Sequence, residues 1–533
     1  MHQHQKYQRM KTIKTIKTTK TAFAPPAAFP RASRGAIIAY VLIFGSIFIL
    51  MLAGLLGYIS LQLKQSSQKV AWNQSLQIAE AGIEYYRWCV NNEVEANCSG
   101  QRDYYDTAGR LLGAFSVAAE SSSACGQVNL RRIISSGWAK DYPAVKRTVK
   151  AVYGRESVAK YSYVLNANVW IGDDHQINGP YHSNGGIRMD GGNQSLMTSA
   201  AIIDDEGKWV CTESFGCCQW RYFWYPYYKN GYDCALDCPS ACTVNVTGTK
   251  LVDGRPVKDE CVCPGIFSTT ANPSPDLFKF PVPPFDFNGV TVDLGQIKER
   301  AVNGGGIYFP PAADRKPGSK GYHVKLREDG KFEVYFIMAL QQVSGYSEEE
   351  GDVKDWFIIN NEQADANNPY TIPSDCAVLY FEDNLWIEGT VRGKITVASA
   401  NLISTGVETS VVLPGNIQYV DYGGANGLAL IGQKNVLIGP QSPEDMVLDA
   451  VIVAQKGRFG RNHYEDNFRD SLTIRGSVIS NGRVGTQWTS GGQMVSGYAQ
   501  RYTYSDQGQV YNPPPFVMSM GSDYKIVSWE EME

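Results

Sequence analysis

The side chains that could act as catalytic acids, bases or nucleophiles are few in this sequence and lie far apart. Beyond residue 10 the histidines are His175, His182, His323 and His463. Neither a nucleophile-elbow motif nor an H-E-x-x-H zinc motif accompanies them. The sequence therefore favours a protein that is not an enzyme, and it predicts neither catalytic residues nor a cofactor.

Two acidic groups could in principle hold calcium or work as acid–base pairs. One is Asp173-Asp174 with Asp190, and the other is Glu348-Glu349-Glu350 with Asp352. Either role requires a defined separation of carboxylates across a groove, which sequence spacing does not fix. Acidic runs of this kind are typical of solvated loops, so we predict no metal site.

Cysteine is the reactive residue type that does cluster. Eight of the twelve cysteines lie within 53 residues: Cys211, Cys217, Cys218, Cys234, Cys238, Cys242, Cys261 and Cys263. Zinc binding is disfavoured because this window contains no histidine, two of its cysteines are adjacent, and it has no pair of C-x-x-C knuckles. Such a density of cysteines in a segment that is exported across a membrane indicates disulfides, and the sequence leaves their pairing open.

Aromatic residues are interleaved with these cysteines. The set comprises Trp209, Trp220, Tyr222, Phe223, Trp224, Tyr225, Tyr227, Tyr228 and Tyr232. Rigid amphipathic rings in excess of what a small lobe can bury could anchor a surface glycan or a protein. We take Trp220, Tyr222, Trp224, Tyr225 and Tyr227 as candidate ligand-binding residues. The alternative is that these rings build the lobe's own core or dock the lobe onto the rest of the body.

The chain that carries this lobe has, near its N-terminus, a hydrophobic segment that is predicted to form a helix. The uncharged run from Ala36 to Leu63 has 28 residues, which at about 1.5 Å per residue exceeds the roughly 30 Å hydrocarbon core of a bilayer. A cleaved secretory signal has a shorter apolar core followed by a small-residue cleavage site, and neither is present. The run therefore predicts a single-pass anchor in the inner membrane.

The flanks of this helix predict its orientation. Residues 1–35 carry eight positive side chains and no acid, whereas residues 36–533 carry a net charge of −12. The N-terminus is therefore expected in the cytoplasm and the body in the periplasm or outside the cell. The repeat at 11–17 (Lys-Thr-Ile-Lys-Thr-Ile-Lys) could also be a nucleic-acid tail, but a topogenic leader is the better interpretation, so we predict no nucleic-acid partner.

Beyond the membrane the helix should continue as an amphipathic stem. Leu76, Ala79, Ile83, Tyr86 and Val90 recur at spacings of three and four, the pattern of one helical face. The opposite face carries polar residues, Gln74, Gln77, Glu80 and Glu84. One helix over 36–92 is thus predicted to start as a membrane span and to end as the support of a soluble domain.

This N-terminal region resembles type IV pilin-like proteins, in particular the PilX-type minor pilins. The resemblance rests on Pro30-Arg31-Ala32-Ser33-Arg34-Gly35 ahead of the apolar helix and on Leu76-Gln77-Ile78-Ala79-Glu80-Ala81-Gly82-Ile83-Glu84. It implies that a prepilin peptidase cuts after Gly35 and methylates the new N-terminus, Ala36. It also implies that helix 36–63 packs against other pilins or pseudopilins.

Two positions depart from the pattern of major pilins. That pattern places Phe or Met first and Glu fifth after the cut, whereas this chain has Ala36 and Tyr40. In pilins the glutamate is thought to pair with the N-terminal amine of a neighbour. Its absence disfavours a repeating shaft subunit and fits a minor or tip subunit. An uncleaved signal anchor is the alternative.

The body contains a weak internal repeat. Gly179–Ile187 and Gly476–Val484 share the pattern G-x-φ-x-S-N-G-x-φ, where φ is apolar or aromatic. Short β-branched strands with polar corners recur between them. Taking Val397, Ile431, Val453 and Ile479 as equivalent gives spacings of 34, 22 and 26 residues, typical of solenoid coils. A right-handed parallel β-helix carrying the Cys-rich insertion is predicted, with a jelly roll or sandwich as the alternative.

The predicted organisation has six parts. They are a prepilin-like leader (1–35), the helix and stem (36–92), the N-terminal part of the body with the first coils (93–204), the Cys- and aromatic-rich insertion (205–265), a Pro-rich connector with a hairpin and loops (266–375), and coils with a C-terminal cap (376–533). A hairpin is expected over Tyr322–Ile337 with its turn at Asp329-Gly330, and a loop over Val343–Asn368.

The body is also similar to the passenger regions of large PilX-N-type pilus assembly proteins. That similarity covers most of 36–200 and 290–533 and rests on the Ser-Asn-Gly corners, the run Leu385–Gly393 and the tail with Pro-Pro-Pro-Phe and Ser-Trp-Glu-Glu. The favoured function is a minor pilin or a tip component of a pilus. The alternatives are a membrane-anchored surface β-helix without a pilus role and an envelope carbohydrate-active enzyme.

Overall fold

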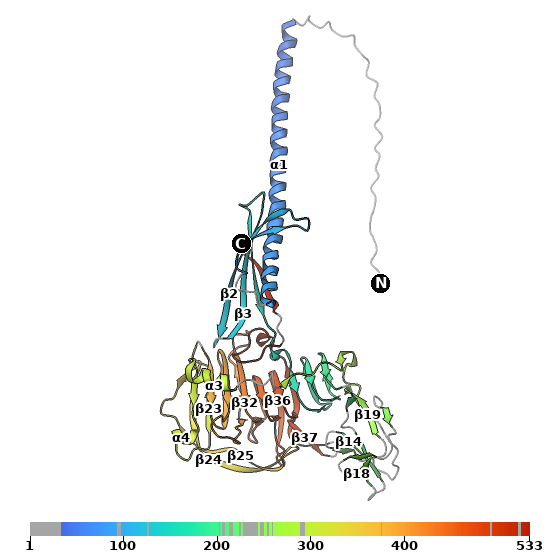
Figure 1. Cartoon of the computed structure of the whole chain (residues 1–533), viewed down its shortest axis with the longest axis vertical. Helices are drawn as coiled ribbons and strands as arrows, with labels where there is room; N and C mark the ends of the chain where they lie inside the picture. The colour runs from blue at the N-terminus through green and yellow to red at the C-terminus, as the bar shows by residue number, and fades with distance from the viewer. Residues whose placement is uncertain are drawn as a thin grey trace, which may run out of the picture. The chain divides into compact units, whose positions relative to one another are not determined.

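The structure is a computed structural model in which the chain forms two compact units, Met1–Val70 and Ala71–Glu533. It describes residues 34–92, 98–124, 127–201, 203–204, 208–212, 217–222, 225–227, 243–245, 250–252, 255–257, 260–287, 294–374, 376–490, 493–520 and 524–532. The chain is mainly β with one long N-terminal helix (Figure 1).

Helix α1 runs without interruption from Arg34 to Asn91 and confirms the single helix predicted over 36–92. In the first unit its large apolar side chains between Ile38 and Leu63 are exposed. Among the described residues α1 is the one helix long and apolar enough to span a membrane. Since exposing so much apolar surface to water is unfavourable, this part of α1 needs lipid or another apolar partner.

In the second unit the end of α1 packs on a five-stranded antiparallel sheet. Its strands, in spatial order, are β1 (Gly100–Tyr105), β2 (Leu111–Ala124), β3 (Gln127–Ala139), β4 (Lys146–Gly154) and β39 (Lys525–Met532). Of the predicted helical face, Ala79, Ile83, Tyr86 and Val90 are buried and Leu76 packs at the margin. The stem interpretation of this face is therefore confirmed.

Glycine allows an unusually close approach of α1 to this sheet. A Cβ on Gly137 of β3 would lie 2.3 Å from the Ala79 nitrogen and 2.5 Å from the Ser75 oxygen. Ser75 Oγ in turn lies 2.8 Å from the Val145 carbonyl oxygen and accepts a hydrogen bond from Ala139 N at 3.3 Å. Because the two backbones nearly touch here, any side chain at position 137 must push the helix away.

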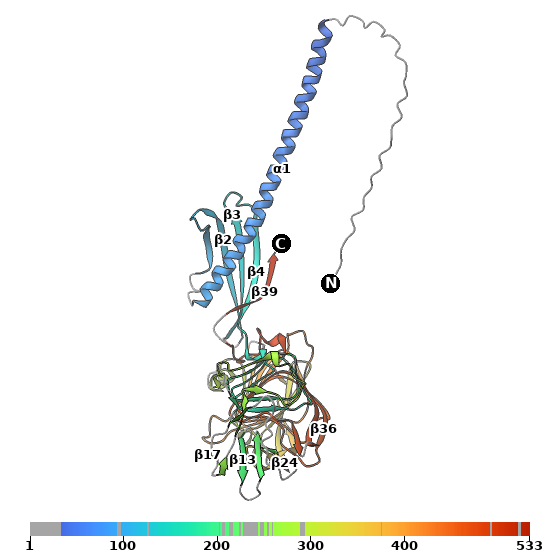
Figure 2. The same ribbon diagram turned by 90° about the vertical axis from the view of Figure 1, so that its right-hand side faces the viewer.

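The last strand of the sheet comes from the far end of the chain. β39 pairs antiparallel with β4, with Trp529 opposite Ala151 (Figure 2). Glu530 forms an ion pair with Lys150 at 2.5 Å. Residues 155–524 are therefore an insertion between two hydrogen-bonded strands. The C-terminal cap predicted within 376–533 is wrong for residues 525–532, because the backbone of β39 completes this sheet instead.

The inserted body is built on parallel strand pairing. Ladder one contains, in spatial order, β22 (Ile307–Phe309), β27 (Val378–Phe381), β29 (Lys394–Ser399), β32 (Gly427–Gly432), β34 (Asp445–Ala454), β36 (Phe468–Ser480), β5 (Tyr163–Leu165), β8 (Tyr181–Ser183), β11 (Met197–Ser199) and β21 (Phe278–Lys279). Jelly rolls are built from antiparallel strands, so that alternative does not fit these residues.

Three further sets of parallel strands run beside ladder one. Ladder two consists of β23 (Tyr322–Leu326), β28 (Leu385–Val391), β30 (Val411–Leu413), β33 (Val436–Ile438) and β35 (Phe459–Gly460). Ladder three consists of the end of β28, β31 (Ile417–Tyr419), the first halves of β34 and β36, β38 (Gln493–Tyr504), β7 (His175–Asn178) and β10 (Gly192–Asn193). The shortest set is β6 (Val169–Ile171), β9 (Ile187–Met189) and β20 (Ile266–Phe267).

The spatial order of the coils is not the order of the sequence. β5, the first strand of the body, pairs with β36 near the C-terminus, whereas β21 and β22, which are neighbours in sequence, lie at the two opposite ends of ladder one. The chain thus enters and leaves the body beside the same coil. Ser157 N donates a hydrogen bond to the Val510 oxygen at 2.7 Å where the incoming and outgoing segments meet.

The corners of the predicted repeat do stack on one another. Asn184 Nδ2 donates to Asn166 Oδ1 at 2.7 Å, and Asn166 Nδ2 donates to Asn481 Oδ1 at 2.9 Å. These bonds link the two Ser-Asn-Gly corners through the coil that lies between them. A short ladder of asparagines thus satisfies the polar groups at each turn.

The equivalence predicted for the coil positions is correct at three positions of four. Ile431, Val453 and Ile479 are in direct register, but the residue paired with Ile431 on β29 is Ala398, so Val397 is one residue off. Because successive strand residues face opposite sides, this shift moves Val397 into the core between the ladders. The other three lie on the outer face of ladder one.

That outer face is covered by the chain itself. Phe285 and Phe287 of the Pro-rich connector and Phe516 of the C-terminal segment pack in one apolar cluster with Ile431, Val453 and other side chains of ladder one. The segment that contains Phe516, which belongs to the predicted C-terminal cap, therefore lies along the side of the coils. Because ladder one is buried on both sides, strands such as β27 and β32 are continuous apolar runs.

The predicted hairpin at Asp329-Gly330 is confirmed. β23 pairs antiparallel with β24 (Lys331–Ser347), and Arg327 N donates to the Lys331 oxygen at 2.9 Å. The loop predicted over Val343–Asn368 is wrong, since β24 continues into a second antiparallel pairing with β25 (Gly351–Ala364). Three of its acidic residues, Glu348, Glu349 and Glu350, form the turn between the two strands, so the acidic run that suggested a loop belongs to a hairpin.

The close approach at Gly137 generates a test of the stem. Gly137→Ala should destabilise the packing of α1 on the sheet by about 1–3 kcal/mol, because the added methyl group overlaps backbone atoms. The measurement is hydrogen exchange of the α1 amides around residues 75–83 in the full chain. Gly485→Ala is the control, since a Cβ there meets nothing within 4 Å. Equal protection in both variants would contradict the close packing.

Candidate functional site

The predicted processing residues lie at the start of α1. Gly35 and Ala36 are in its first turn. Cleavage between them stays a prediction.

Part of the aromatic insertion forms a small sheet. β13 (Lys208–Thr212), β14 (Cys217–Tyr222) and β15 (Tyr225–Tyr227) pair antiparallel. Trp220 is opposite both Trp209 and Tyr227, and Tyr222 is opposite Tyr225. Residues that pair directly or alternate along a strand occupy one face, so these positions share a face. Trp224 lies outside the described residues.

The cysteines are brought together only in part. Cys211 and Cys218 are opposite each other on β13 and β14, and Cys261 and Cys263 lie on β19 (Glu260–Pro264). Cys263 is in a disulfide. Cys217 is on β14, and Cys234, Cys238 and Cys242 lie outside the described residues, so the predicted pairing of this cluster stays a prediction.

Cysteines outside the Cys-rich insertion also form disulfides, which were not predicted from the sequence. Cys89, at the end of α1, is bonded to Cys98, just before β1. Cys376, which precedes β27, is also in a disulfide. The nine-residue spacing across the end of the predicted helix was a signal for the first of these. Their presence fits an oxidising compartment for the body.

Several of the acidic residues considered for metal binding form ion pairs with cationic side chains. Asp190 is buried and bonds Arg188 Nε at 2.6 Å. Glu349 pairs with Arg458 at 3.0 Å and Glu350 with Lys434 at 2.7 Å. In the described part of the chain no cluster of three or more His, Cys, Asp or Glu side chains could hold a metal ion.

The four histidines do not converge on one site. His175 is half-buried and His182 is buried, and His182 Nδ1 lies 2.9 Å from Thr198 Oγ1. His463 packs edge-on against Trp488. His323 differs because it lies between two carboxylates, Glu362 at 2.6 Å and Glu388 at 3.2 Å.

The His323 cluster is an ionic tie between strands rather than an acid–base pair poised in a groove. Burial opposes the charge on His323, but the hydrogen bonds to Glu362 and Glu388 outweigh it and raise its pKa. The contact with His323 lowers the pKa of Glu388, although burial opposes this. Since β23, β25 and β28 each contribute one residue, the cluster holds the hairpin against ladder two.

This cluster predicts how stability depends on pH. A raised histidine pKa contributes stability that is fully present below the unfolded value of 6.5 and is lost as pH rises through the folded value. The difference in unfolding free energy between the native chain and His323→Gln should therefore shrink between pH 6 and pH 9. Thermal unfolding of both chains at several pH values measures it. A difference that stays constant with pH would contradict the prediction.

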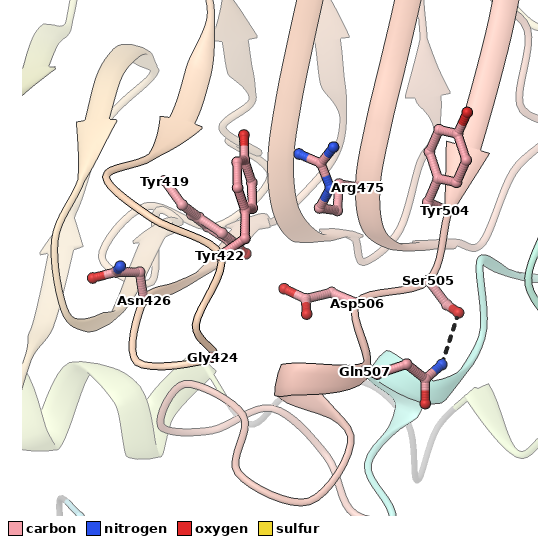
Figure 3. A pocket seen from close by; sticks show the side chains of 9 residues that line it. All are labelled: Tyr419, Tyr422, Gly424, Asn426, Arg475, Tyr504, Ser505, Asp506 and Gln507. Atoms are coloured by element: carbon pink, nitrogen blue, oxygen red, sulfur yellow. Dashed lines mark hydrogen bonds between the residues drawn. The ribbon is translucent and has the colours of Figure 1, made fainter.

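A pocket of about 210 Å³ opens on the outer side of ladder three, at the C-terminal ends of β31 and β38 and beside Arg475 in the middle of β36. It is lined by Tyr419, Tyr422, Gly424, Asn426, Arg475, Tyr504, Ser505, Asp506 and Gln507. In Figure 3 the side chains of Tyr422, Arg475 and Tyr504 stand in a row, and Asp506 lies below them. The pocket thus combines aromatic rings with charged and amide groups.

A buried carboxylate fixes one wall of the pocket. Asp449 is fully buried; its Oδ2 accepts hydrogen bonds from Tyr419 N at 2.9 Å and from the Tyr422 hydroxyl at 3.0 Å, and its Oδ1 pairs with Arg475 at 3.0 Å. The Arg475 guanidinium lies 4.1 Å from the centroid of the Tyr422 ring. Burial raises the pKa of Asp449, and these hydrogen bonds and the charge of Arg475 oppose that rise.

The facing wall is a turn that follows β38. Asp506 Oδ1 accepts a hydrogen bond from Gly508 N at 2.9 Å, and Oδ2 accepts one from Gln509 Nε2 at 3.2 Å. Gln507 Nε2 donates to Ser505 Oγ at 3.1 Å (Figure 3). A carboxylate that is held at both oxygens is oriented in advance, yet each oxygen has a second acceptor position for a ligand.

Sequence analysis did not find this pocket. Its residues come from three separate segments, and only register brings Asp449, Arg475 and Tyr504 side by side on adjacent strands. The signals that were present are the Gly423-Gly424 loop and the tyrosines at 498, 502 and 504.

The network around Asp449 yields a prediction about the pocket wall. Asp449→Ala should leave Tyr419 N and Arg475 without their partner, at a cost of about 1–3 kcal/mol, and should loosen the loop over residues 419–426. Hydrogen exchange of that loop is the measurement. Asp445→Ala, an exposed position on the same strand, is the control and should leave exchange unchanged. Equal exchange in both variants would contradict the role of Asp449.

Comparison with known proteins adds little to this description. No protein-family model matches the sequence, and no curated protein matches it. Among solved structures, the competence-associated pilin ComZ from Thermus thermophilus is similar, with 11% sequence identity and a TM-score of 0.27. The match covers 87% of this chain and 97% of that chain, and at this similarity it carries no argument about this protein.

Proposed function

We propose that this chain is a non-enzymatic minor pilin or tip component of a type IV pilus-like system. The observation that carries the proposal is that two successive stretches of α1 have different surroundings. One stretch exposes apolar side chains from Ile38 to Leu63, and the next buries Ala79, Ile83 and Tyr86 against an antiparallel sheet. A helix of this kind serves both as a membrane anchor and as the support of an exported domain.

The apolar part of α1 is proposed to be the assembly element. Its side chains are exposed along 38–63, so it can remain in the inner membrane or pack against the helices of other pilins or pseudopilins. Tyr40, at the position where major pilins have glutamate, fits a subunit present in few copies. The prepilin peptidase is the proposed processing partner, acting between Gly35 and Ala36.

The inserted body is proposed to be a right-handed parallel β-helix that is presented outside the membrane. The support is the parallel register of ladders one to three and the asparagine ladder at their corners. Because the body is inserted between β4 and β39, its mass is added without altering the pairing of α1 with the sheet. Such a body suits adhesion or assembly at a pilus tip, whereas in a shaft it would crowd its neighbours.

The Cys-rich insertion is proposed as an adhesive surface for a glycan or a protein. The support is the register that places Trp220, Tyr222, Tyr225 and Tyr227 at positions on one face of a small sheet. Paired aromatic positions of this kind recur at binding surfaces.

The proposal is tested at the N-terminus of the protein recovered from its own cells. We expect a chain that begins at Ala36 when the prepilin peptidase is present and at Met1 when it is absent. Gly35→Val should block cleavage, whereas the control Gly45→Val, a glycine in open surroundings of the same helix, should leave it intact. Intact mass and N-terminal sequencing measure both. A native chain that still begins at Met1 would leave a membrane-anchored surface protein without a pilus role.

A further inference from the structure

We propose that the pocket formed by Tyr422, Arg475, Tyr504 and Asp506 binds one unit of a neutral saccharide chain, whose next units lie along the outer face of ladder three. This inference goes beyond the proposed function, and it does not depend on cleavage or on assembly into a pilus. It rests on four observations about the body.

The first observation is that, among the described residues, ladder three is the long ladder whose outer face stays open to solvent. The outer face of ladder one is covered by Phe287, Phe516 and the segments around them. On ladder two, Trp386 and Val412 are covered by the β24–β25 hairpin, and Trp386 Nε1 donates to the Phe357 oxygen at 2.8 Å. In the described part of the chain, ladder three keeps Thr473, Gln500 and Tyr502 accessible to solvent.

The second observation is that large aromatic rings are exposed beside polar groups. Tyr422 is 59% exposed and Tyr504 is 39% exposed, although both are large hydrophobic side chains. A sugar ring has an apolar face of C–H groups and a rim of hydroxyls. It can therefore cover a tyrosine ring while its hydroxyls replace the water around the polar residues.

The third observation is the balance of charge. Arg475 is already paired with the buried Asp449, so its charge is compensated inside the protein. Asp506 is the other charged residue of the pocket lining, with Lys394 as a nearby cation behind it, and it offers acceptor positions on both oxygens. An anionic ligand would meet this carboxylate unfavourably, whereas a neutral polyhydroxyl ligand can donate hydrogen bonds to it.

The fourth observation is that the pocket continues into a strip. Asp449, Arg475, Tyr504 and Asn178 are in register on four adjacent strands. Two residues earlier on each strand, Val447, Thr473, Tyr502 and Gln176 form the next row. The intervening Leu472 and Ile474 point into the core, so both rows face outward. An extended chain of sugars fits a regular, flat strip better than an isolated small molecule does.

The pocket also has the rigidity that weak polar contacts require. Asp449 holds the loop with Tyr422 on one side, and Gly508 N and Gln509 hold Asp506 on the other. Because these groups are fixed before a ligand arrives, binding need not order them.

The test is binding of the purified full chain to immobilised cellohexaose, maltohexaose, xylohexaose and chitohexaose, with hexagalacturonate as the anionic probe. The detergent should be lauryldimethylamine oxide, which has no sugar headgroup to compete. We expect binding to at least one neutral hexasaccharide. Tyr504→Ala and Asp506→Ala should each weaken it about tenfold or more.

Two control variants locate the site. Trp356→Ala removes an exposed ring of β25, far in sequence from the pocket, and should leave binding unchanged. Trp220→Ala removes a ring of the aromatic insertion and should also leave it unchanged. Thermal unfolding of each variant checks its folding, and Tyr504→Ala, an exposed position, keeps the test valid if Asp506→Ala does not fold.

Three outcomes would overturn the inference. One is no binding to any neutral hexasaccharide, and another is binding to hexagalacturonate alone. The third is neutral binding that is lost in Trp220→Ala and kept in Tyr504→Ala, which would assign glycan recognition to the insertion and support the adhesive role proposed for it. None of these outcomes bears on whether the chain is cut at Gly35.

Discussion

The pairing of β4 with β39 is the constraint on which the rest of the structure depends. Two adjacent strands of one sheet hold the two ends of the inserted body, so the chain must enter and leave that body at neighbouring points. The permuted order of coils meets this requirement, because β5 stacks on β36 and Ser157 bonds to Val510 where the two segments meet. With its ends fixed in this way, the body adds little loop-closure entropy to the folding of the stem.

Because the coils are not stacked in the order of the sequence, the chain needs a long return path, and the connecting segments pack against the coils along it. A chain that stacks its first coils on its last must run the length of ladder one between β21 and β22. That return path lies on the outer face of ladder one, where Phe285 and Phe287 bury side chains of the coils that they pass. The Pro-rich composition suits this role, since proline removes backbone donors that an extended segment would otherwise leave unpaired. The connector is thus part of the core rather than a tether.

Local patterns predicted the local structure, and the sequence carried less information on long-range pairing. The three- and four-residue spacing of Ala79, Ile83 and Tyr86 gave the buried face of α1, and Asp329-Gly330 gave its hairpin. The displacement of Val397 by one residue shows the limit, because its coil neighbours are equally apolar on both faces and spacing alone does not fix register. The pairing of β39 with β4 and the permuted coil order depend on contacts between residues hundreds of positions apart.

The same distinction explains which candidate sites could be found. The aromatic insertion is contiguous, so composition alone drew attention to Trp220 and its neighbours. The pocket is assembled from three segments that meet only because Arg475 and Tyr504 are in register. The pocket is a candidate site because it lies on a surface that the rest of the protein leaves uncovered, and not because its residues are rare. Ladders one and two are covered by segments of the same chain. A ligand that lies along the coils can therefore bind to ladder three, where Tyr422 and Tyr504 are exposed.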